Sequence, residues 1–289
     1  MLPDPVGWSS CGGYVQAAQL TWMQLGGRRI DNADSYHNQR SVGIAMKTFV
    51  TRSGTPRSDL FLTSKVGPYL PLGFNETLAQ FANILAVTGA GYTDLVLIHW
   101  PTCDGACTTT AVSTDPPCVW GAASYDERLC RLSTWRALVS VWKSGGSRSI
   151  GVSNYNSTQL QEIADAGLPL PAVVQNPFHI AHSVGEMDTL AYCIAHNITF
   201  NGYSPLGVPD RKTHAAYPAG LLLNDPVALA IAAAHGRSVA EVMLAWQWSL
   251  GILVNPRTQN AAHMLENLNF MDIELTASEI QQLSSRPQD

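Results

Sequence analysis

The amino-acid sequence predicts a (β/α)₈ barrel, an α/β fold in which eight parallel strands close into one domain spanning residues 1–289. Three observations indicate this fold. Short apolar runs alternate with helical patterns along the whole chain, which is typical of a parallel sheet. No linker or change of composition divides the chain, and 289 residues accommodate one barrel of roughly 250 residues. An open, doubly wound sheet is the alternative.

The expected strands are short runs that are almost continuously apolar, as parallel strands buried on both faces should be. They are residues 28–31, 60–65, 94–99, 149–153, 172–175, 198–203 and 252–255. A strand near Pro5–Trp8 would complete the set of eight.

Helical patterns separate these strands. They cover residues 14–25, 39–49, 75–88, 133–143, 157–166, 184–196 and 226–249. The last of them should break at Gly236, because Ser238 and Glu241 form a capping box that starts a new helix. Thr276 and Glu279 start a final helix in the same way.

The longest irregular segment is the insert Pro101–Leu132, which follows the fourth expected strand. Loops of this length are usually functional, and in a barrel this one lies on the rim that carries active sites. Its cysteines are Cys103, Cys107, Cys118 and Cys130. Free thiols are the favoured interpretation and a disulfide within the insert is the second, because cytosolic disulfides are rare. Zinc is the third, since the paired short spacings of zinc modules are missing.

Composition excludes several classes of protein. Apolar residues make up 46% of the chain and charged residues 13%, which indicates a folded domain rather than a disordered one. A net charge of −5 without a basic stripe argues against a nucleic-acid partner. No apolar run has the roughly 18 residues of a membrane span, and the first residues do not resemble a signal peptide. We therefore expect a cytoplasmic protein without a membrane partner or a metal.

Polar residues that can do acid–base chemistry end three consecutive strands. If the strand near Pro5–Trp8 is counted as the first, Asp31, Lys65 and His99 end the second, third and fourth strands. Tyr36 follows Asp31 by five residues. Each alone has an ordinary structural explanation, but together they favour one site. A tyrosine titrates near pH 10 in isolation, and a neighbouring ammonium lowers that pKa by stabilising the phenolate. Such a group protonates an oxygen that gains negative charge.

These residues lie in segments that resemble the aldo-keto reductase family. GGRRIDNADSYHNQRSVGIAMK is similar to the family signature, DLFLTSK to its lysine strand and YTDLVLIHWP to its histidine strand. GGSRSIGVSNYNSTQL, NGYSPLG and LVNPRTQNAAHMLENLNFMDIELTASEI resemble its later cofactor-binding segments. The similar segments occur in family order from about Val6 to Leu283.

The resemblance implies a (β/α)₈ TIM barrel that binds a nicotinamide cofactor without a Gly-x-Gly-x-x-Gly motif. It also implies that the protein reduces a small aldehyde or ketone to an alcohol by hydride transfer. Tyr36 would be the general acid, Lys65 paired with Asp31 would lower its pKa, and His99 would orient the carbonyl group.

The resemblance also implies which residues contact the cofactor. Ser153, Asn154 and Gln175 match the carboxamide-binding residues, Tyr203 matches the ring that stacks on the nicotinamide, and Ser204, Leu206 and Gly207 match the pyrophosphate loop. Arg257, Thr258 and His263 match the residues at the 2′-phosphate, and Glu266 and Asn267 match those at the adenine. NADP(H) is therefore the expected cofactor. His263 stands where an arginine is usual, so NAD(H) should also be accepted.

The chain departs from the family pattern at several points. From the resemblance we expect the protein to lack the usual N-terminal hairpin plug and the long C-terminal loop. Val174 stands where an asparagine is usual. We expect an open substrate pocket with the insert as its main wall and Trp8, Trp100 and Trp120 as apolar lining, in a monomer or weak dimer. The alternative functions are a catalytically weak barrel that serves as a binding or structural subunit, and a Schiff-base aldolase that uses Lys65.

Overall fold

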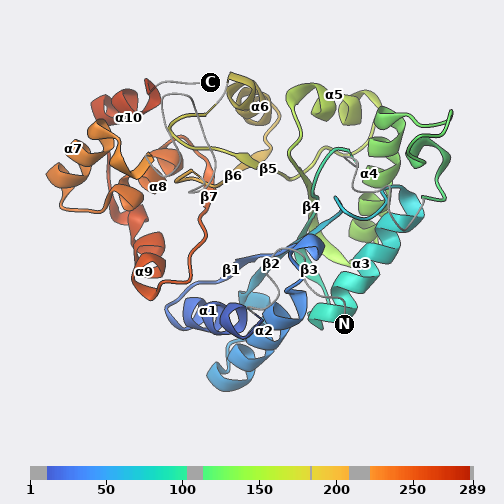
Figure 1. Cartoon of the computed structure of the whole chain (residues 1–289), viewed down its shortest axis with the longest axis horizontal. Coiled ribbons are helices and arrows are strands. Elements are labelled where there is room, and N and C mark those ends of the chain that lie inside the picture. Colours follow the sequence, from blue (N-terminus) through green and yellow to red (C-terminus); the bar gives the residue numbers. More distant parts are fainter. Residues whose placement is uncertain (1–11, 103–112, 183, 208–221, 287–289) are drawn as a thin grey trace. The chain divides into compact units, whose positions relative to one another are not determined.

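The computed structural model describes residues 12–102, 113–182, 184–207 and 222–286, and its elements are labelled in Figure 1. The chain divides into two compact units, Met1–Ala172 and Val173–Asp289. The expected strand near Pro5–Trp8 lies outside the described residues.

The first unit contains four parallel strands that pair in chain order. They are β1 (Arg29–Asp31), β2 (Phe61–Val66), β3 (Thr93–Ile98) and β4 (Ser147–Ser153). Every residue of β3 is buried, as the uninterrupted apolar run predicts for a strand covered on both faces. The four predicted strands are confirmed, with ends that move by at most two residues.

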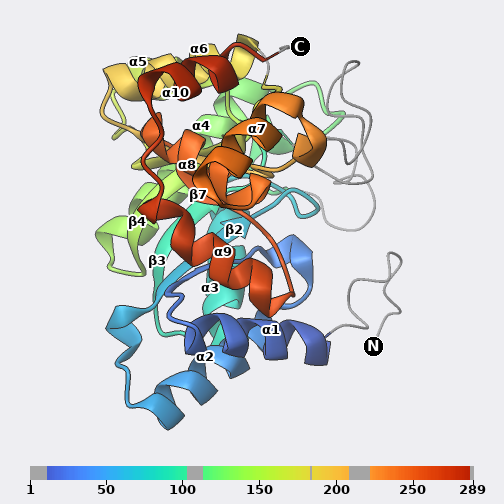
Figure 2. The ribbon, with the colours of Figure 1, turned by 90° about the vertical axis from the view of Figure 1, so that its left-hand side faces the viewer.

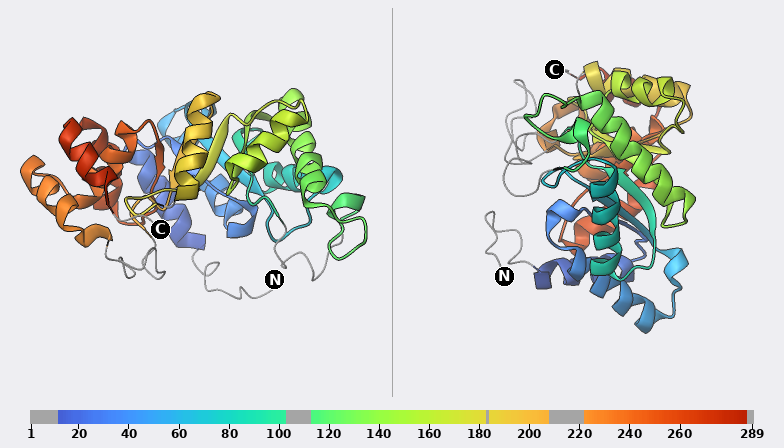
Figure 3. Two further views of the ribbon diagram at one scale, coloured as in Figure 1. Left: turned by 90° about the horizontal axis from the view of Figure 1, so that it is seen from above. Right: turned by 90° about the vertical axis from the view of Figure 1, so that its right-hand side faces the viewer.

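Helices precede, separate and follow these strands along the chain. They are α1 (Gly12–Gln24), α2 (Gln39–Ser53), α3 (Phe74–Thr88), α4 (Glu127–Lys143) and α5 (Ser157–Asp165). Helices α1 and α2 lie side by side (Figure 2), as do α3 and α4 (right-hand view of Figure 3). Helix α2 also lies close to α3 at Gly43. A Cβ atom at this position would lie only 2.1 Å from the carbonyl oxygen of Thr88, so the contact requires a glycine.

A buried carboxylate joins the amino-terminal ends of β2 and β3. The side chain of Asp94 is 2% exposed and accepts a hydrogen bond of 2.9 Å from the backbone N–H of Leu62. Arg57 and Arg148 pair with it at 3.0 and 3.4 Å. Because the carboxylate is almost fully buried, these partners compensate for the loss of its hydration. Asp94 thus stabilises the end of the sheet opposite to His99.

The insert differs from expectation in two ways. Its last residues are helical, because the Asp126 side chain caps α4 by accepting a 2.8 Å hydrogen bond from the Leu129 N–H. Free thiols, the favoured interpretation of the cysteines, are wrong for Cys118 and Cys130, which form a disulfide. Both cysteines are buried against Leu72. Because Cys130 lies in α4, the disulfide joins the insert to this helix. Cys103 and Cys107 lie outside the described residues.

Polar contacts also hold the described part of the insert against α3 and α4. The Asp115 carboxylate accepts hydrogen bonds from the Phe74 N–H and the Ser133 hydroxyl. The Thr114 hydroxyl donates to Glu76 at 2.7 Å. The disulfide and these bonds together fix residues 113–118 on the first unit.

The second unit contains three parallel strands that also pair in chain order. They are β5 (Val173–Pro177), β6 (Thr199–Tyr203) and β7 (Leu253–Asn255). Its helices are α6 (Val184–Ala195), α7 (Pro226–His235), α8 (Val239–Ser249), α9 (Ala261–Asn269) and α10 (Ala277–Ser284). Leu244, Ala245 and Phe270 form a core cluster to which Leu206 and Val254 contribute.

The expected break at Gly236 is confirmed, since this residue ends α7 in a left-handed conformation with φ of 62°. Both predicted capping boxes are present, at Ser238 with Glu241 and at Thr276 with Glu279. The sequence did not predict α9 as a helix. Among the described residues, no single helix has both the length and the hydropathy of a membrane span, although α7 and α8 taken together do, with a bend of 96° between them.

Candidate active site

Four polar side chains meet at the carboxyl-terminal edge of the strands in the first unit. Asp31 is the last residue of β1, Lys65 is the penultimate residue of β2, and His99 directly follows β3. Tyr36 ends a short 3₁₀ helix, Asp34–Tyr36, that follows β1. The carboxyl ends of parallel strands share one edge of the sheet, which is why residues so distant in sequence meet here.

The centre of this cluster is the ammonium group of Lys65, whose residue is 1% exposed. Its Nζ atom donates to the Asp31 carboxylate, to the Tyr36 hydroxyl at 3.2 Å and to the Asn32 carbonyl oxygen at 3.2 Å. All three protons of the ammonium therefore have acceptors. Burial by itself lowers the pKa of Lys65, but the charge of Asp31 and the contact with Tyr36 outweigh it, so the pKa is raised. The lysine is a fixed positive charge.

Tyr36 is the most exposed member of the cluster, at 37%. Its ring meets the His99 ring edge to face, with centroids 5.6 Å apart and planes at 83°. The preceding turn is tied to the start of α2, because Gln39 donates a 2.5 Å hydrogen bond to the Asp34 carboxylate. The phenol is thus held between Lys65 and His99 and remains accessible from solvent.

His99 is buried, with 9% of its surface exposed. Burial, together with the nearby charge of Lys65, lowers its pKa to about 4. The imidazole is therefore neutral near pH 7 and has one N–H donor and one lone pair. Its Nδ1 atom lies 3.2 Å from the Ser35 hydroxyl.

Two of the expected cofactor residues adjoin this cluster. Asn154, just after β4, donates a 2.8 Å hydrogen bond to the backbone carbonyl of His99 and a 3.1 Å bond to the Ser153 hydroxyl. Asn156, and not Ser153, caps α5, in a capping box with Gln159. The β4 terminus therefore supports the position of His99.

The other expected cofactor residues lie in the second unit. Gln175 is buried in β5, and Tyr203 is half-buried at the end of β6. Ser204 is left-handed, with φ of 52°, and its carbonyl accepts a 2.9 Å bond from the Gly207 N–H. Leu206 packs into the core of this unit.

The remaining expected residues flank the start of α9. Arg257 is exposed, and the Thr258 hydroxyl lies 3.4 Å from the Nδ1 atom of His263. Glu266 and Asn267 follow on the same helix. A guanidinium, a hydroxyl and an imidazole near a helix N-terminus are the donors that suit a phosphate group.

The expected apolar lining is described only in part. Trp100 and Trp120 are 40% and 45% exposed, so neither is a core residue, and Trp120 packs edge to face on Tyr125. Trp8 lies outside the described residues. No group of His, Cys, Asp and Glu arranged for a metal ion occurs within the described ranges.

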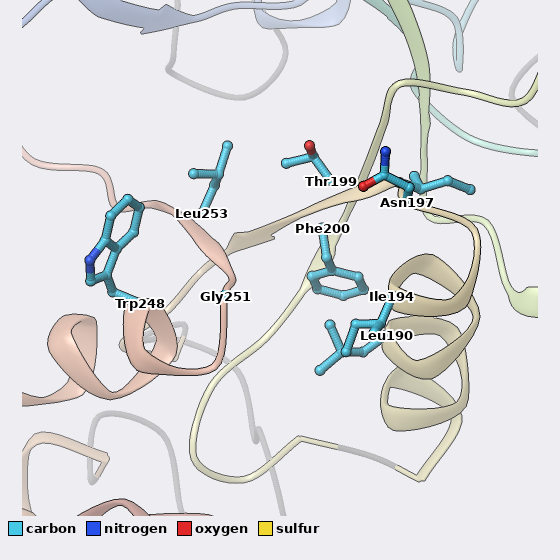
Figure 4. A pocket seen from close by; sticks show the side chains of 9 residues that line it. Leu190, Ile194, Asn197, Thr199, Phe200, Trp248, Gly251 and Leu253 are labelled. Carbon is cyan, nitrogen blue, oxygen red and sulfur yellow. The ribbon is translucent and has the colours of Figure 1, made fainter. Parts of the chain in front are cut away.

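A separate pocket of about 390 Å³ lies in the second unit (Figure 4). It is formed between α6, α8 and the starts of β6 and β7, and its side chains include Leu190, Phe200 and Trp248. Because it lies at the amino-terminal ends of these strands and contains none of the expected site residues, it is not the predicted cofactor site.

Comparison with known proteins identifies the family. The model of the aldo/keto reductase family matches residues 14–286. The chain belongs to the aldo/keto reductase family. It is 33% identical to aldo-keto reductase family 1 member A1 of Bos taurus over 281 residues, which cover 96% of this chain and 83% of that protein. It is 31% identical to an uncharacterized oxidoreductase of Bacillus subtilis over 274 residues, 95% of this chain and 84% of that protein.

Solved structures of the family have the same fold. An aldo-keto reductase complexed with NADPH is 27% identical, with a TM-score of 0.82, and the match covers 99% of this chain and 80% of that one. An aldo/keto reductase from Brucella melitensis is 28% identical, with a TM-score of 0.76, over 96% of this chain and 91% of that one. These matches confirm the predicted fold class, the (β/α)₈ barrel.

The sequence did not single out two residues of this cluster. Ser35 contacts His99, and Asn32 supplies a carbonyl oxygen to Lys65. The amide atoms of the Asn32 side chain are buried and have no hydrogen-bond partner among the described residues. Both residues lie within the family-like segment between Asp31 and Tyr36, but only the folded turn shows which atoms they present.

Proposed function

We propose that the protein reduces an aldehyde or ketone to the corresponding alcohol with NADPH, and that Tyr36 is the general acid. The observation that carries this proposal is the buried ammonium of Lys65, which contacts the Asp31 carboxylate on one side and the Tyr36 hydroxyl on the other. The carbonyl carbon gains a hydride and the carbonyl oxygen gains a proton, while NADPH becomes NADP⁺. When bound, the reduced nicotinamide supplies that hydride.

Tyr36 is assigned as the proton donor because its hydroxyl is both accessible and next to a fixed cation. Proton transfer leaves a phenolate, and the buried ammonium of Lys65, 3.2 Å from the hydroxyl oxygen, stabilises this negative charge. Asp31 balances the charge of the ammonium and orients it. Lys65 and Asp31 therefore act through Tyr36.

His99 is assigned to the carbonyl oxygen. Since burial and the charge of Lys65 lower its pKa to about 4, it stays neutral and does not compete with Tyr36 as an acid near pH 7. A neutral imidazole still offers one N–H, which can hold the carbonyl oxygen near the Tyr36 hydroxyl. This role makes His99 a determinant of which carbonyl compounds are accepted.

NADP(H) is the proposed cofactor, with weaker use of NAD(H). In the second unit we assign Arg257, Thr258 and His263 to the 2′-phosphate and Glu266 and Asn267 to the adenine. Tyr203 is assigned to the nicotinamide ring, and Ser204, Leu206 and Gly207 to the pyrophosphate. Ser153, Asn154 and Gln175 are assigned to the carboxamide. The similar solved protein in complex with NADPH and the phosphate-type donors at α9 support this assignment.

The test is a cofactor titration followed by a substrate panel on the purified full-length chain. NADPH should bind more tightly than NADH, and a panel of aldehydes and ketones should reveal compounds that drive NADPH oxidation. Lys65→Met is the matched control, which should bind NADPH but turn over at least about 100-fold more slowly. If the wild-type protein binds NADPH and reduces none of the panel, the role as a binding or structural subunit is favoured instead.

A further inference from the structure

We propose that Asp34 and Gln39 are positioning residues whose side-chain hydrogen bond keeps the Tyr36 hydroxyl against Lys65. This inference rests on the proposed function, in which Tyr36 is the proton donor. The pair lies outside the predicted catalytic set and outside the expected cofactor contacts.

The short turn that carries Tyr36 needs side-chain anchors. It is a single turn of 3₁₀ helix, Asp34–Tyr36, with backbone hydrogen bonds of 3.2 Å from Tyr36 to Ala33 and from His37 to Asp34. His37 ends it in the left-handed region, with φ of 53°, which is unfavourable for a residue with a side chain. Such a conformation persists only where the surrounding contacts hold it. The anchors of the turn therefore decide where the Tyr36 hydroxyl lies.

The Asp34–Gln39 hydrogen bond joins this turn to α2. Gln39 is the first residue of α2 and is 5% exposed, and its Nε2 atom donates to the Asp34 carboxylate at 2.5 Å. The Asn38 side chain forms no capping hydrogen bond, and the first turn of α2 has no acidic residue. The Asp34 carboxylate lies beside this helix start, where a negative charge is favourable.

The other two residues of the turn contact the site itself. The Ser35 hydroxyl lies 3.2 Å from the Nδ1 atom of His99, and the Tyr36 hydroxyl lies 3.2 Å from Lys65. Asp34 instead contacts α2, whose residues are not part of the candidate site. Because Tyr36 follows Asp34 by two residues on the same turn, a shift of Asp34 away from α2 moves the phenol relative to Lys65.

The pair combines one carboxylate with one amide, and this complementarity can be tested. A hydrogen bond from an amide to an ionised carboxylate is stronger than one between neutral groups. Burial raises the pKa of the Asp34 carboxyl, and the hydrogen bond from Gln39 opposes this rise, so the amide favours the charged form. A carboxylate in place of the amide would repel Asp34. Exchange of the two groups would restore the hydrogen bond with donor and acceptor reversed.

The first measurement is kinetic and follows this exchange in the purified full-length chain, with NADPH and a carbonyl substrate. Gln39→Glu should lower kcat about 10-fold and leave KM nearly unchanged, because it displaces a group that acts in the transition state. Asp34→Asn keeps an acceptor oxygen and should stay within about 3-fold of the wild type. The double variant Asp34→Asn with Gln39→Glu should recover kcat to within about 3-fold of the wild type.

Two further variants complete this experiment. Asp34→Ala removes the acceptor without adding a charge, and it should lower kcat by a factor similar to that of Gln39→Glu. The matched control is Gln161→Glu, because Gln161 donates to Asp165 at 2.8 Å in an exposed pair on α5. This variant should retain the wild-type kcat.

The second measurement is independent of activity. Crystal structures of the wild type, of Gln39→Glu and of the double variant are compared at the Tyr36 hydroxyl. Its contact with Lys65 should be present in the wild type and in the double variant. In Gln39→Glu the two atoms should lie more than about 3.5 Å apart, beyond hydrogen-bond distance.

Thermal unfolding of the same samples separates positioning from simple stabilisation of the fold. If the pair only stabilises the fold, Gln39→Glu and Asp34→Ala lower the unfolding midpoint and the folded proteins keep the wild-type kcat, which would overturn the inference. So would a double variant no more active than Gln39→Glu, or an unchanged contact between Tyr36 and Lys65 in the Gln39→Glu structure. A failure of the proposed function would instead appear as a Tyr36→Phe protein of normal activity, whatever the position of the turn.

Discussion

The low pKa of His99 predicts that this residue contributes to the destabilisation of the fold by acid. In the folded protein, burial and the charge of Lys65 lower the pKa from its ordinary value of 6.5 to about 4. As the pH falls below about 6.5, His99 binds a proton in the unfolded chain, whereas in the folded protein it does so only near pH 4. The free energy of unfolding therefore decreases between about pH 6.5 and pH 4. Each tenfold difference in proton affinity is worth about 1.4 kcal/mol, so the full effect is about 3 kcal/mol.

The assay is guanidinium unfolding followed by tryptophan fluorescence at pH 7 and at pH 5. Between these values the His99 contribution should lower the free energy of unfolding by about 2 kcal/mol. His99→Gln removes the titrating group, and its stability should fall by about 2 kcal/mol less than that of the wild type over the same interval. Tyr36→Phe retains His99 and should show the wild-type dependence. An equal loss in wild type and His99→Gln would refute the reasoning.

Other predictions test the stability of the first unit and the choice of cofactor. Asp94→Ala should lower the free energy of unfolding by about 2–4 kcal/mol, because it removes the acceptor of a buried N–H and the carboxylate partner of two arginines; the exposed Asp165→Ala is the control, and equal stability of both variants would contradict this role. Reduction of the Cys118–Cys130 disulfide, or Cys118→Ser with Cys130→Ser, should cost about 3 kcal/mol for the 12-residue separation, and an unchanged midpoint in thermal unfolding would argue against it. Arg257→Ala should weaken NADPH binding about 10-fold and leave NADH binding nearly unchanged in fluorescence titrations, whereas equal losses would show that the 2′-phosphate is recognised elsewhere.

The strands and most helices could be predicted because their signals are local. Continuous apolar runs identified β1 to β7 within two residues, and side-chain caps such as Ser238 with Glu241 identified helix starts. The missed features have weaker local signals. Helix α9 is short and largely exposed, and only its cap, Asn260, marks its start. The helical residues before Ser133 were assigned to the insert, although Asp126 followed by Glu127 is an N-terminal signal.

Some features of the candidate site could likewise be predicted from the sequence, and others could not. Asp31, Lys65 and His99 could be brought together from the sequence, because strand ends of a parallel sheet share one edge. The Cys118–Cys130 bond could not, since it depends on how the insert packs against α3 and α4. Ser35 could not either, because a serine in a turn carries no pattern of its own and its contact with His99 depends on the folded turn.

The central claim is that Tyr36 donates the proton to a carbonyl oxygen. It is tested most directly by single-turnover reduction of a carbonyl substrate with NADPH in wild type and in Tyr36→Phe, with NADPH affinity and folding measured on the same samples. The claim predicts a fall of at least about 100-fold in the rate with cofactor affinity nearly unchanged. Retention of more than about a tenth of the wild-type rate in the folded variant, well above that expectation, would contradict it and assign the proton to another group.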